Sequence, residues 1–173
     1  MSTIARPRIW QRFLLHGLIA TTALGLGFLS WFIAKPLAIR LYETVPGQRV
    51  TVTAAPNIEI SLDADSSVAV SNTEPPRIEL LRGNAYFDVR GEGAGKLQVK
   101  VGTTQITDTG TRFSVIKRAN GGTVAVADGQ VEIQVESGTY LVGAQEGVDF
   151  DGIRITNQRM ISEAAVAPWR SGR

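Results

Sequence analysis

The sequence predicts an all-β fold: a single domain of short antiparallel strands, arranged as a sandwich or a twisted β-solenoid, preceded by one transmembrane helix. Three observations support this prediction. From residue 50 onward, apolar residues recur at every second position, as in strands with one face in a core and one in water. Turn-forming Gly, Asn, Asp and Pro residues separate these runs. Near the N-terminus, a long uncharged stretch has the length of a membrane-spanning helix.

The predicted membrane segment covers residues 13–34, which carry no formal charge. A helix of about 20 residues crosses the hydrocarbon core of a bilayer. Trp10 and Trp31 lie near the two ends, where indole rings favour the interface. A cleaved signal peptide is the alternative, but its apolar core would have only about 7–15 residues. We therefore expect an uncleaved anchor.

The charges around this segment predict its orientation. Arg6, Arg8 and Arg12 precede it, and no acidic residue does. By the positive-inside rule, the N-terminus is expected in the cytoplasm and the rest of the chain in the periplasm. We therefore expect a single-pass protein of the inner membrane, with residues 1–12 as a cytoplasmic stub and residues 35–44 as a juxtamembrane connector.

The β-domain is predicted to span residues 45–160, with roughly a dozen short strands. Its clearest alternating runs contain Val50 and Val52; Ile58, Ile60 and Leu62; Val68 and Val70; Ile78 and Leu80; Leu97, Val99 and Val101; Val124 and Val126; and Val131, Ile133 and Val135. Asp128-Gly129 lies between two such runs and predicts a hairpin, because both residues tolerate positive φ. In residues 161–173 we expect a short helix that Ser162 caps and Pro168 limits.

Two aromatic residues are expected at the centre of the core. Gly83 predicts a bulge or bend, after which Phe87 lies on the inward face of its strand. Phe113 lies on the inward face of a second run. Large aromatic side chains contribute the most buried area per residue, so we expect both to anchor the core. Val126 and Val131 are the expected aliphatic anchors.

The charge pattern argues against a nucleic-acid-binding protein. The net charge is +2, but three of the 18 basic residues precede the predicted membrane segment. The remaining 15 are outnumbered by 16 acidic residues and alternate with them along the chain. Binding to phosphates needs basic residues clustered on one surface. We therefore expect no nucleic-acid partner.

The residue types needed for common catalytic and metal sites are missing. There is no cysteine, and the single histidine, His16, lies in the predicted membrane segment. This excludes a Ser-His-Asp or Cys-His arrangement in the β-domain. Asp63 and Asp65 could bind calcium weakly, but the glycine and distal glutamate of a calcium loop are missing. We expect no enzymatic activity, no cofactor, no metal and no small-molecule substrate.

The polar residues of most interest are Arg82, Asp88 and Arg112. In one interpretation the two guanidinium groups tie turns together, through backbone carbonyls or through Asp88 and Asp108. In the other, these residues recognise a partner. We favour the structural interpretation, because charged residues on strands are commonly solvated or paired locally.

The sequence resembles the extracytoplasmic domain of the FecR family. The resemblance rests on the runs RGNAYFDV (82–89), GTRFSV (110–115) and VAVADGQVEI (124–133), in that order and spacing. The opening ETVPGQRVTV (43–52) and the closing WRSGR (169–173) fit the same pattern, so it extends from Tyr42 to Arg173. FecR proteins are inner-membrane regulators of extracytoplasmic-function sigma factors. Their partners include the signalling domain of an outer-membrane TonB-dependent transducer, often one for ferric siderophores.

The chain departs from the family plan at both ends. Family members carry a helical, sigma-binding domain before the membrane helix, whereas residues 1–12 are too few to bury a core. Longer relatives continue beyond the match to Arg173 into a second, transducer-contacting domain. We therefore expect the sensing half of such a regulator, without these two domains.

Two functions follow as alternatives. The first is regulation of a sigma-factor pathway of the iron-uptake type, through a transducer signalling domain or a sigma or anti-sigma component. The second is a membrane-tethered structural or interaction module, or a truncated regulator, with no sigma-factor activity. In either case an envelope protein is the expected partner, and edge-strand pairing is a natural mode of binding it.

Overall fold

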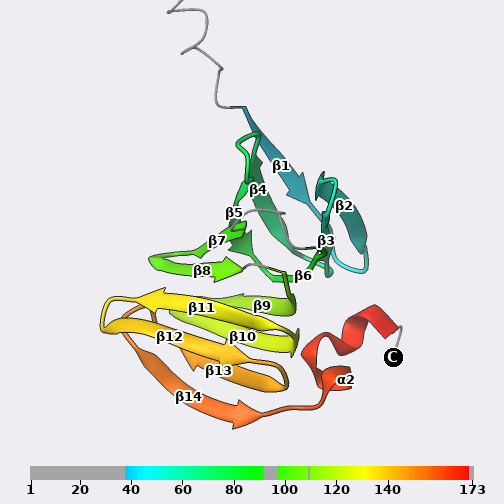
Figure 1. Ribbon diagram of the computed structural model, residues 1–173. Coiled ribbons are helices and arrows are strands. Elements are labelled where there is room, and N and C mark those ends of the chain that lie inside the picture. Colours follow the sequence, from blue (N-terminus) through cyan, green and yellow to red (C-terminus); the bar gives the residue numbers. More distant parts are fainter. Residues whose placement is uncertain (1–37, 92–96, 109, 172–173) are drawn as a thin grey trace, which may run out of the picture. The chain divides into compact units, whose positions relative to one another are not determined.

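The computed structural model describes residues 38–91, 97–108 and 110–171 (Figure 1). The predicted stub, the membrane segment 13–34 and the start of the connector lie outside these ranges, so the anchor stays a prediction. Within the described ranges, no helix is long and apolar enough to cross a membrane. What is described is an all-β fold of two sheets, as the alternating pattern predicted.

Each sheet has seven strands. Sheet A contains, in spatial order, β1 (Ile39–Glu43), β4 (Ser67–Ser71), β5 (Arg77–Arg82), β7 (Leu97–Val101), β8 (Thr104–Asp108), β11 (Gln130–Val135) and β12 (Gly138–Gly143). Sheet B contains β14 (Ile155–Met160), β13 (Glu146–Phe150), β10 (Gly121–Asp128), β9 (Arg112–Arg118), β6 (Asn84–Val89), β3 (Ile58–Leu62) and β2 (Val50–Ala55).

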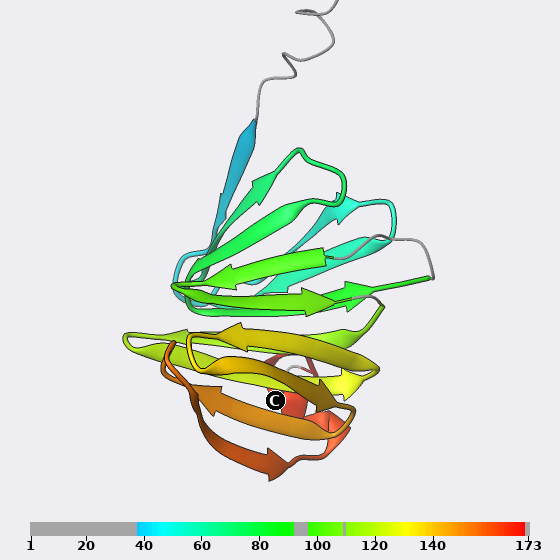
Figure 2. The ribbon, with the colours of Figure 1, turned by 60° about the vertical axis from the view of Figure 1, so that its left-hand side comes forward.

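In both sheets the strands follow one another in sequence order from one edge of the sheet to the other. Successive segments enter the two sheets alternately: β2–β3 in sheet B, β4–β5 in sheet A, β6 in sheet B, β7–β8 in sheet A and β9–β10 in sheet B. The colours of Figures 1 and 2 therefore run in order from β1 to β14 along the stack. The prediction of purely antiparallel strands was wrong at one position: β5 and β7 pair in parallel, because β6 carries the chain through sheet B between them.

A single apolar core lies between the sheets. Inward-facing residues of both sheets are fully buried, among them the four predicted anchors Phe87, Phe113, Val126 and Val131. The alternation explains this arrangement, since successive side chains of a strand point to opposite faces. In β6, Ala85, Phe87 and Val89 face the core, while Asp88 faces the opposite side.

The folded domain begins earlier than the sequence suggested. Residues 35–44 were predicted as a connector, but β1 occupies residues 39–43 and pairs with β4 without a register shift. The reason for the difference is that the two apolar residues of β1 that alternate with Arg40 and Tyr42 do not enter the core. Ile39 and Leu41 are 63% and 56% exposed.

Two glycines form corners at which the chain changes sheets. Gly83 has φ +78° and connects β5 in sheet A to β6 in sheet B. A Cβ atom there would lie 2.6 Å from the carbonyl oxygen of Asp65. The hairpin predicted at Asp128-Gly129 was wrong, because β10 belongs to sheet B and β11 to sheet A. Positive φ at Gly129 makes this corner instead of a hairpin.

The C-terminal segment ends in the predicted short helix, α2 (Glu163–Val166), followed by a 3-10 turn, η1 (Pro168–Ser171). Ser162 occupies the N-cap position, but its side chain makes no capping hydrogen bond. The segment is held by tertiary contacts with sheet B, described next.

Candidate functional site

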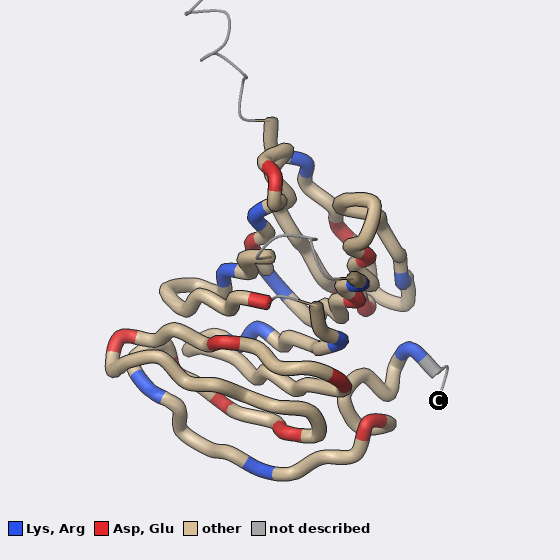
Figure 3. The backbone as a smooth tube through the Cα atoms, in the orientation of Figure 1, with Lys and Arg blue, Asp and Glu red and all other residues tan. Residues whose placement is uncertain are grey.

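The outer face of sheet B carries a group of interacting polar and aromatic side chains. We define this face by the residues of β3, β6, β9 and β10 that point away from the core, together with the C-terminal residues 161–170 that pack on them. In Figure 3, acidic and basic residues alternate over both sheets, so neither sign of charge forms a continuous field.

A small apolar cluster attaches the C-terminal segment to this face. Val166 and Ala167 pack against Tyr86, Ala125 and Ala127, separately from the main core. The hydroxyl of Ser114 donates a hydrogen bond of 2.6 Å to the carbonyl oxygen of Val166. Because α2 has only four residues, these contacts and not helix propensity keep it in place.

Arg112 connects three elements of the outer face. Its Nη1 lies 3.3 Å from Oε1 of Glu163 in α2, and its Nη2 lies 3.6 Å from Oδ2 of Asp128 in β10. The sequence had suggested Asp88 or Asp108 as its ion partner. Asp88 is the cross-strand neighbour of Arg112 in the β6–β9 ladder, but the ion pairs of Arg112 are made with the other two carboxylates.

Asp88 is instead bound by Arg90. The guanidinium donates two hydrogen bonds to it, from Nη2 at 2.8 Å and from Nε at 3.1 Å, and Nη2 also lies 3.3 Å from Glu59. The bidentate contact holds the pKa of Asp88 below its usual value, against the opposing effect of partial burial. The carboxylate therefore stays charged at neutral pH and keeps Arg90 at this face.

Two cation–π contacts fix the last residues of the segment. The guanidinium of Arg170 lies 3.8 Å from the ring centroid of Tyr86, and that of Arg49 lies 5.9 Å from Trp169. Burial raises the pKa of the Tyr86 hydroxyl, although the nearby Arg170 charge opposes this shift. Arg49 also bonds Asp63 at 3.0 Å, which links this face to a second polar group. We call this group the corner cluster; it consists of Thr44, Asp63, Asp65, Ser66, Arg82 and Asn84.

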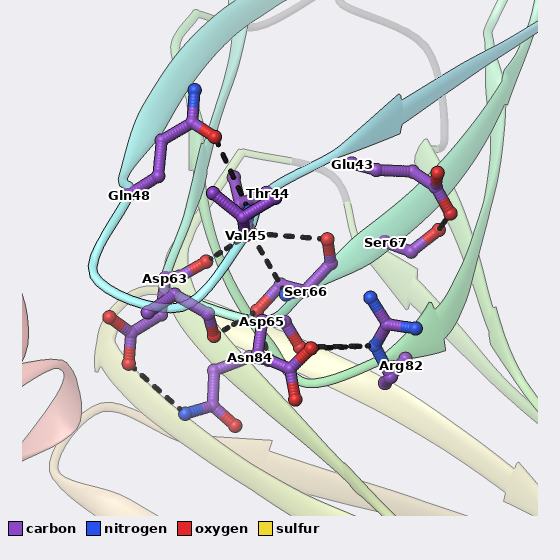
Figure 4. A network of polar contacts seen from close by, with 11 residues as sticks. Glu43, Thr44, Val45, Gln48, Asp63, Asp65, Ser66, Ser67, Arg82 and Asn84 are labelled. Atoms are coloured by element: carbon purple, nitrogen blue, oxygen red, sulfur yellow. Dashed lines mark hydrogen bonds and ion pairs between the residues drawn. The ribbon is translucent and has the colours of Figure 1, made fainter.

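Arg82 lies in that corner cluster, not beside Asp88 and Arg112 (Figure 4). Its Nε lies 3.2 Å from Oδ1 of Asp65 and donates a hydrogen bond of 3.3 Å to the Asp65 carbonyl oxygen. Both groups belong to the turn between β3 and β4. Arg82 thus ties the end of β5 to a neighbouring turn, partly through a backbone carbonyl.

The centre of the corner cluster is buried. Thr44 and Ser66 are almost fully covered, and Ser66 N donates a hydrogen bond of 2.8 Å to Thr44 Oγ1. Thr44 Oγ1 donates to the Asp63 carbonyl at 2.6 Å, and Asn84 N donates to Ser66 Oγ at 2.9 Å. Three chain crossings between the sheets are therefore joined by side-chain hydrogen bonds.

Asp63 is the member of the cluster whose pKa is shifted. Burial alone would raise its pKa, but hydrogen bonds from the Ala64 backbone, Arg49 and Asn84 outweigh burial and lower it. Within the described ranges, no three His, Cys, Asp or Glu side chains are grouped so that they could hold a metal ion. The arrangement of Asp63 and Asp65 is that of a hydrogen-bonded turn.

Sequence reasoning missed several residues of the outer face. Arg90, Glu59, Tyr86 and Glu163 contact residues in other elements, and local patterns carry no signal for such pairs. One signal was available: Trp169 and Arg170 lie in the closing run that resembles the FecR pattern, and both make ring contacts. Thr44 and Ser66 are polar and lie next to turns, where residues are usually exposed, so nothing in the sequence indicated their burial.

Comparison with known proteins agrees with this fold. A sequence model of the family described as FecR protein matches residues 40–132, which is more than half of the chain. The matched region begins in β1 and ends in β11, and it includes the corner cluster and Phe87 and Phe113. No curated protein matches the chain.

Two crystal structures of a candidate anti-sigma factor from Parabacteroides distasonis ATCC 8503 share the fold. The first has a TM-score of 0.69 and 17% sequence identity, and covers 78% of this chain and 66% of that chain. The second has a TM-score of 0.68 and 17% identity, with 77% and 65% covered. The chain thus spans about two thirds of the length of these structures, and at this identity the likeness concerns the fold alone. On the strength of the match over residues 40–132, the chain belongs to the FecR protein family.

Proposed function

We propose that the chain regulates an extracytoplasmic-function sigma-factor pathway of the iron-uptake type, by binding another protein. The observation that carries this proposal is the FecR match over residues 40–132. The fold shared with candidate anti-sigma factors supports it. In this proposal the β-domain acts by binding and has no enzymatic activity. Its partner is the signalling domain of a TonB-dependent transducer or a sigma or anti-sigma component.

The chemistry of the outer face of sheet B suits a protein partner. Arginine side chains are enriched in protein interfaces, and Arg90, Arg112 and Arg170 lie together on this face. Arg90 and Glu163 are 66% and 59% exposed in their side chains, so their charges are available to a second protein. We therefore place the regulatory contact on this face.

Anchoring and compartment are part of the same proposal. The uncharged residues 13–34 and the preceding arginines support a single span with the β-domain in the periplasm. Fusion of a periplasm-active reporter after Arg173 is expected to give an active reporter, and fusion at the N-terminus an inactive one. The reverse result would contradict the proposed orientation.

A charge reversal tests the regulatory contact. Arg90→Glu changes an exposed arginine of the outer face, and Lys100→Glu is a matched control in sheet A, where Lys100 pairs with Glu79 at 3.6 Å. We expect Arg90→Glu to weaken the response of a sigma-dependent reporter, while Lys100→Glu leaves it unchanged. Unfolding curves show whether both variants fold. Equal reporter responses from the two folded variants would show that the regulatory contact does not lie on this face. A reporter that never responds to the chain would favour an interaction module with no sigma-factor activity.

A further inference from the structure

We propose that β1 is a self-association edge, through which two copies of the chain pair as antiparallel strands about a two-fold axis at Leu41. This inference concerns the assembly of the domain and goes beyond the regulatory role proposed above. It rests on the open backbone edge of β1, on its exposed apolar residues and on the order of its charges.

The backbone of β1 leaves one side open. The Ala38 carbonyl accepts from Asn72 N at 3.0 Å, and Thr44 N donates to the Ser66 carbonyl at 2.9 Å, so both groups point toward β4. Backbone groups alternate in direction along a strand. The N–H and C=O groups of Ile39, Leu41 and Glu43 therefore point to the other side, and no strand of the described residues pairs there.

Two of the five side chains of β1 are apolar and exposed, beside the charged Arg40 and Glu43. Ile39 and Leu41 are two residues apart on the same face, and both are more than half exposed. Natural sheet edges are usually protected by charged residues, bulges or covering segments, because an open apolar edge pairs with other chains.

The edges of β2 and β14 carry such protection. The ladder of β2 shifts register between Thr53 and Ala55, and that of β14 shifts opposite Asp149 and Phe150. Bulges of this kind twist an edge away from regular pairing. At the edge of β12, the Gly143 N–H is already bound by the Glu146 carboxylate at 2.8 Å. Unlike the ladders of β2 and β14, the β1 ladder has no register shift.

The sequence of β1 is complementary to itself in one register. With Leu41 opposite the partner's Leu41, all five residues of the strand pair. Arg40 lies opposite the partner's Tyr42, and Ile39 lies opposite the partner's Glu43. No like charges are directly opposed. Ile39, Leu41 and Glu43, whose N–H and C=O groups point away from β4, are then paired with one another across the two strands. Centring the pair on Arg40 would instead place two arginines opposite each other.

The absence of cysteine from the chain makes a disulfide test specific. In the proposed register the two Leu41 Cα atoms lie about 5.5 Å apart, which is within the range for a disulfide. The two Ile39 Cα atoms lie about 15 Å apart, since four residues at about 3.4 Å separate them along the strand and about 5.5 Å separates the strands. Ile39→Cys is therefore a control on the same strand and face. Leu141→Cys, in β12, is a second control that is also 63% exposed.

The full chain is expressed in membranes, treated with a mild oxidant and separated on a non-reducing gel. We expect Leu41→Cys to form predominantly disulfide-linked dimers, and the Ile39→Cys and Leu141→Cys variants to stay monomeric. Dimer formation at Ile39 equal to or above that at Leu41, or equal at all three positions, would overturn the proposal. So would the absence of dimers from all three.

A mass measurement of the full chain in detergent provides a second readout. Leu41→Lys places a charge at the centre of the proposed pair, and Leu141→Lys changes an equally apolar exposed residue on another edge. We expect the unmodified chain and the Leu141→Lys variant to be dimers and the Leu41→Lys variant to be a monomer. A monomeric unmodified chain, or a Leu41→Lys variant that remains a dimer, would overturn the proposal.

Discussion

Phe87 and Phe113 stack with their ring centroids 4.9 Å apart and their planes 19° from parallel. They are cross-strand neighbours in the β6–β9 ladder, and neither is accessible to solvent. Two runs of the family resemblance therefore meet at one aromatic pair in the middle of sheet B. This pair makes the core sensitive to changes in either run.

Phe113→Ala is expected to lower the free energy of unfolding by about 3–5 kcal/mol, because it removes a buried ring and leaves a cavity. Tyr140→Ala is the control, since Tyr140 is 39% exposed at the edge strand β12, and its loss should cost much less. Urea unfolding of both variants measures the difference. Similar midpoints for the two variants would contradict the central position of Phe113.

Gly83→Ala is expected to destabilise the domain more than Gly47→Ala. Both glycines have nearly the same positive φ, +78° and +82°, so the conformational strain of an alanine is similar. A Cβ atom at Gly83 would meet Asp65 and Ser66, whereas one at Gly47 would meet nothing within 4 Å. Thermal unfolding separates the two effects. An equal loss at both positions would show that the corner has room for a side chain.

Ser114→Ala is expected to loosen the C-terminal segment, because it removes the hydrogen bond to the Val166 carbonyl. A buried hydrogen bond of this kind contributes about 1 kcal/mol. Ser61→Ala is the control, since the Ser61 hydroxyl bonds Thr51 at an exposed position. Hydrogen exchange of residues 163–170 should become faster in Ser114→Ala alone. Unchanged exchange would mean that the apolar contacts hold the segment without this bond.

The stability of the domain is expected to fall in acid, partly through Asp63. Its pKa in the folded state lies below the usual value of 3.8, so the unfolded chain binds a proton more readily. The contribution is therefore present above about pH 4 and is lost as the pH falls through the folded-state pKa. Asp63→Asn should be less stable at neutral pH and lose less stability between about pH 5 and pH 2. Parallel curves of unfolding free energy against pH for the variant and the unmodified chain would contradict this assignment.

Many of the strands could be predicted, because a strand that is buried on one face has an apolar residue at every second position. Ile58, Ile60 and Leu62 are an example, and all three are buried in β3. The edge strand β14, with the sequence ITNQRM, has no apolar alternation because most of its side chains are exposed. The two edge strands β1 and β14 therefore escaped the pattern, and β1 was taken for a connector.

The contacts between side chains of the candidate site could not be predicted, because they join residues that are far apart in the sequence. Arg112 meets Glu163 only after β14 has brought the chain back to the outer face of sheet B. The corner at Asp128-Gly129 shows the same limit, since turn chemistry specifies a change of direction and not the sheet that receives the next strand. Arg82, in contrast, bonds the Asp65 carbonyl of a neighbouring turn, as the structural interpretation expected of such arginines.

We propose above that this FecR-family chain regulates a sigma-factor pathway. The most direct measurement is the level of extracytoplasmic-function sigma-dependent transcripts in a strain that lacks the chain, compared with the parent strain and with the deletion strain carrying the chain again. We expect these transcripts to change on deletion and to return to the parental level on complementation. Transcript levels that are the same in all three strains, with and without the inducing signal, would contradict it.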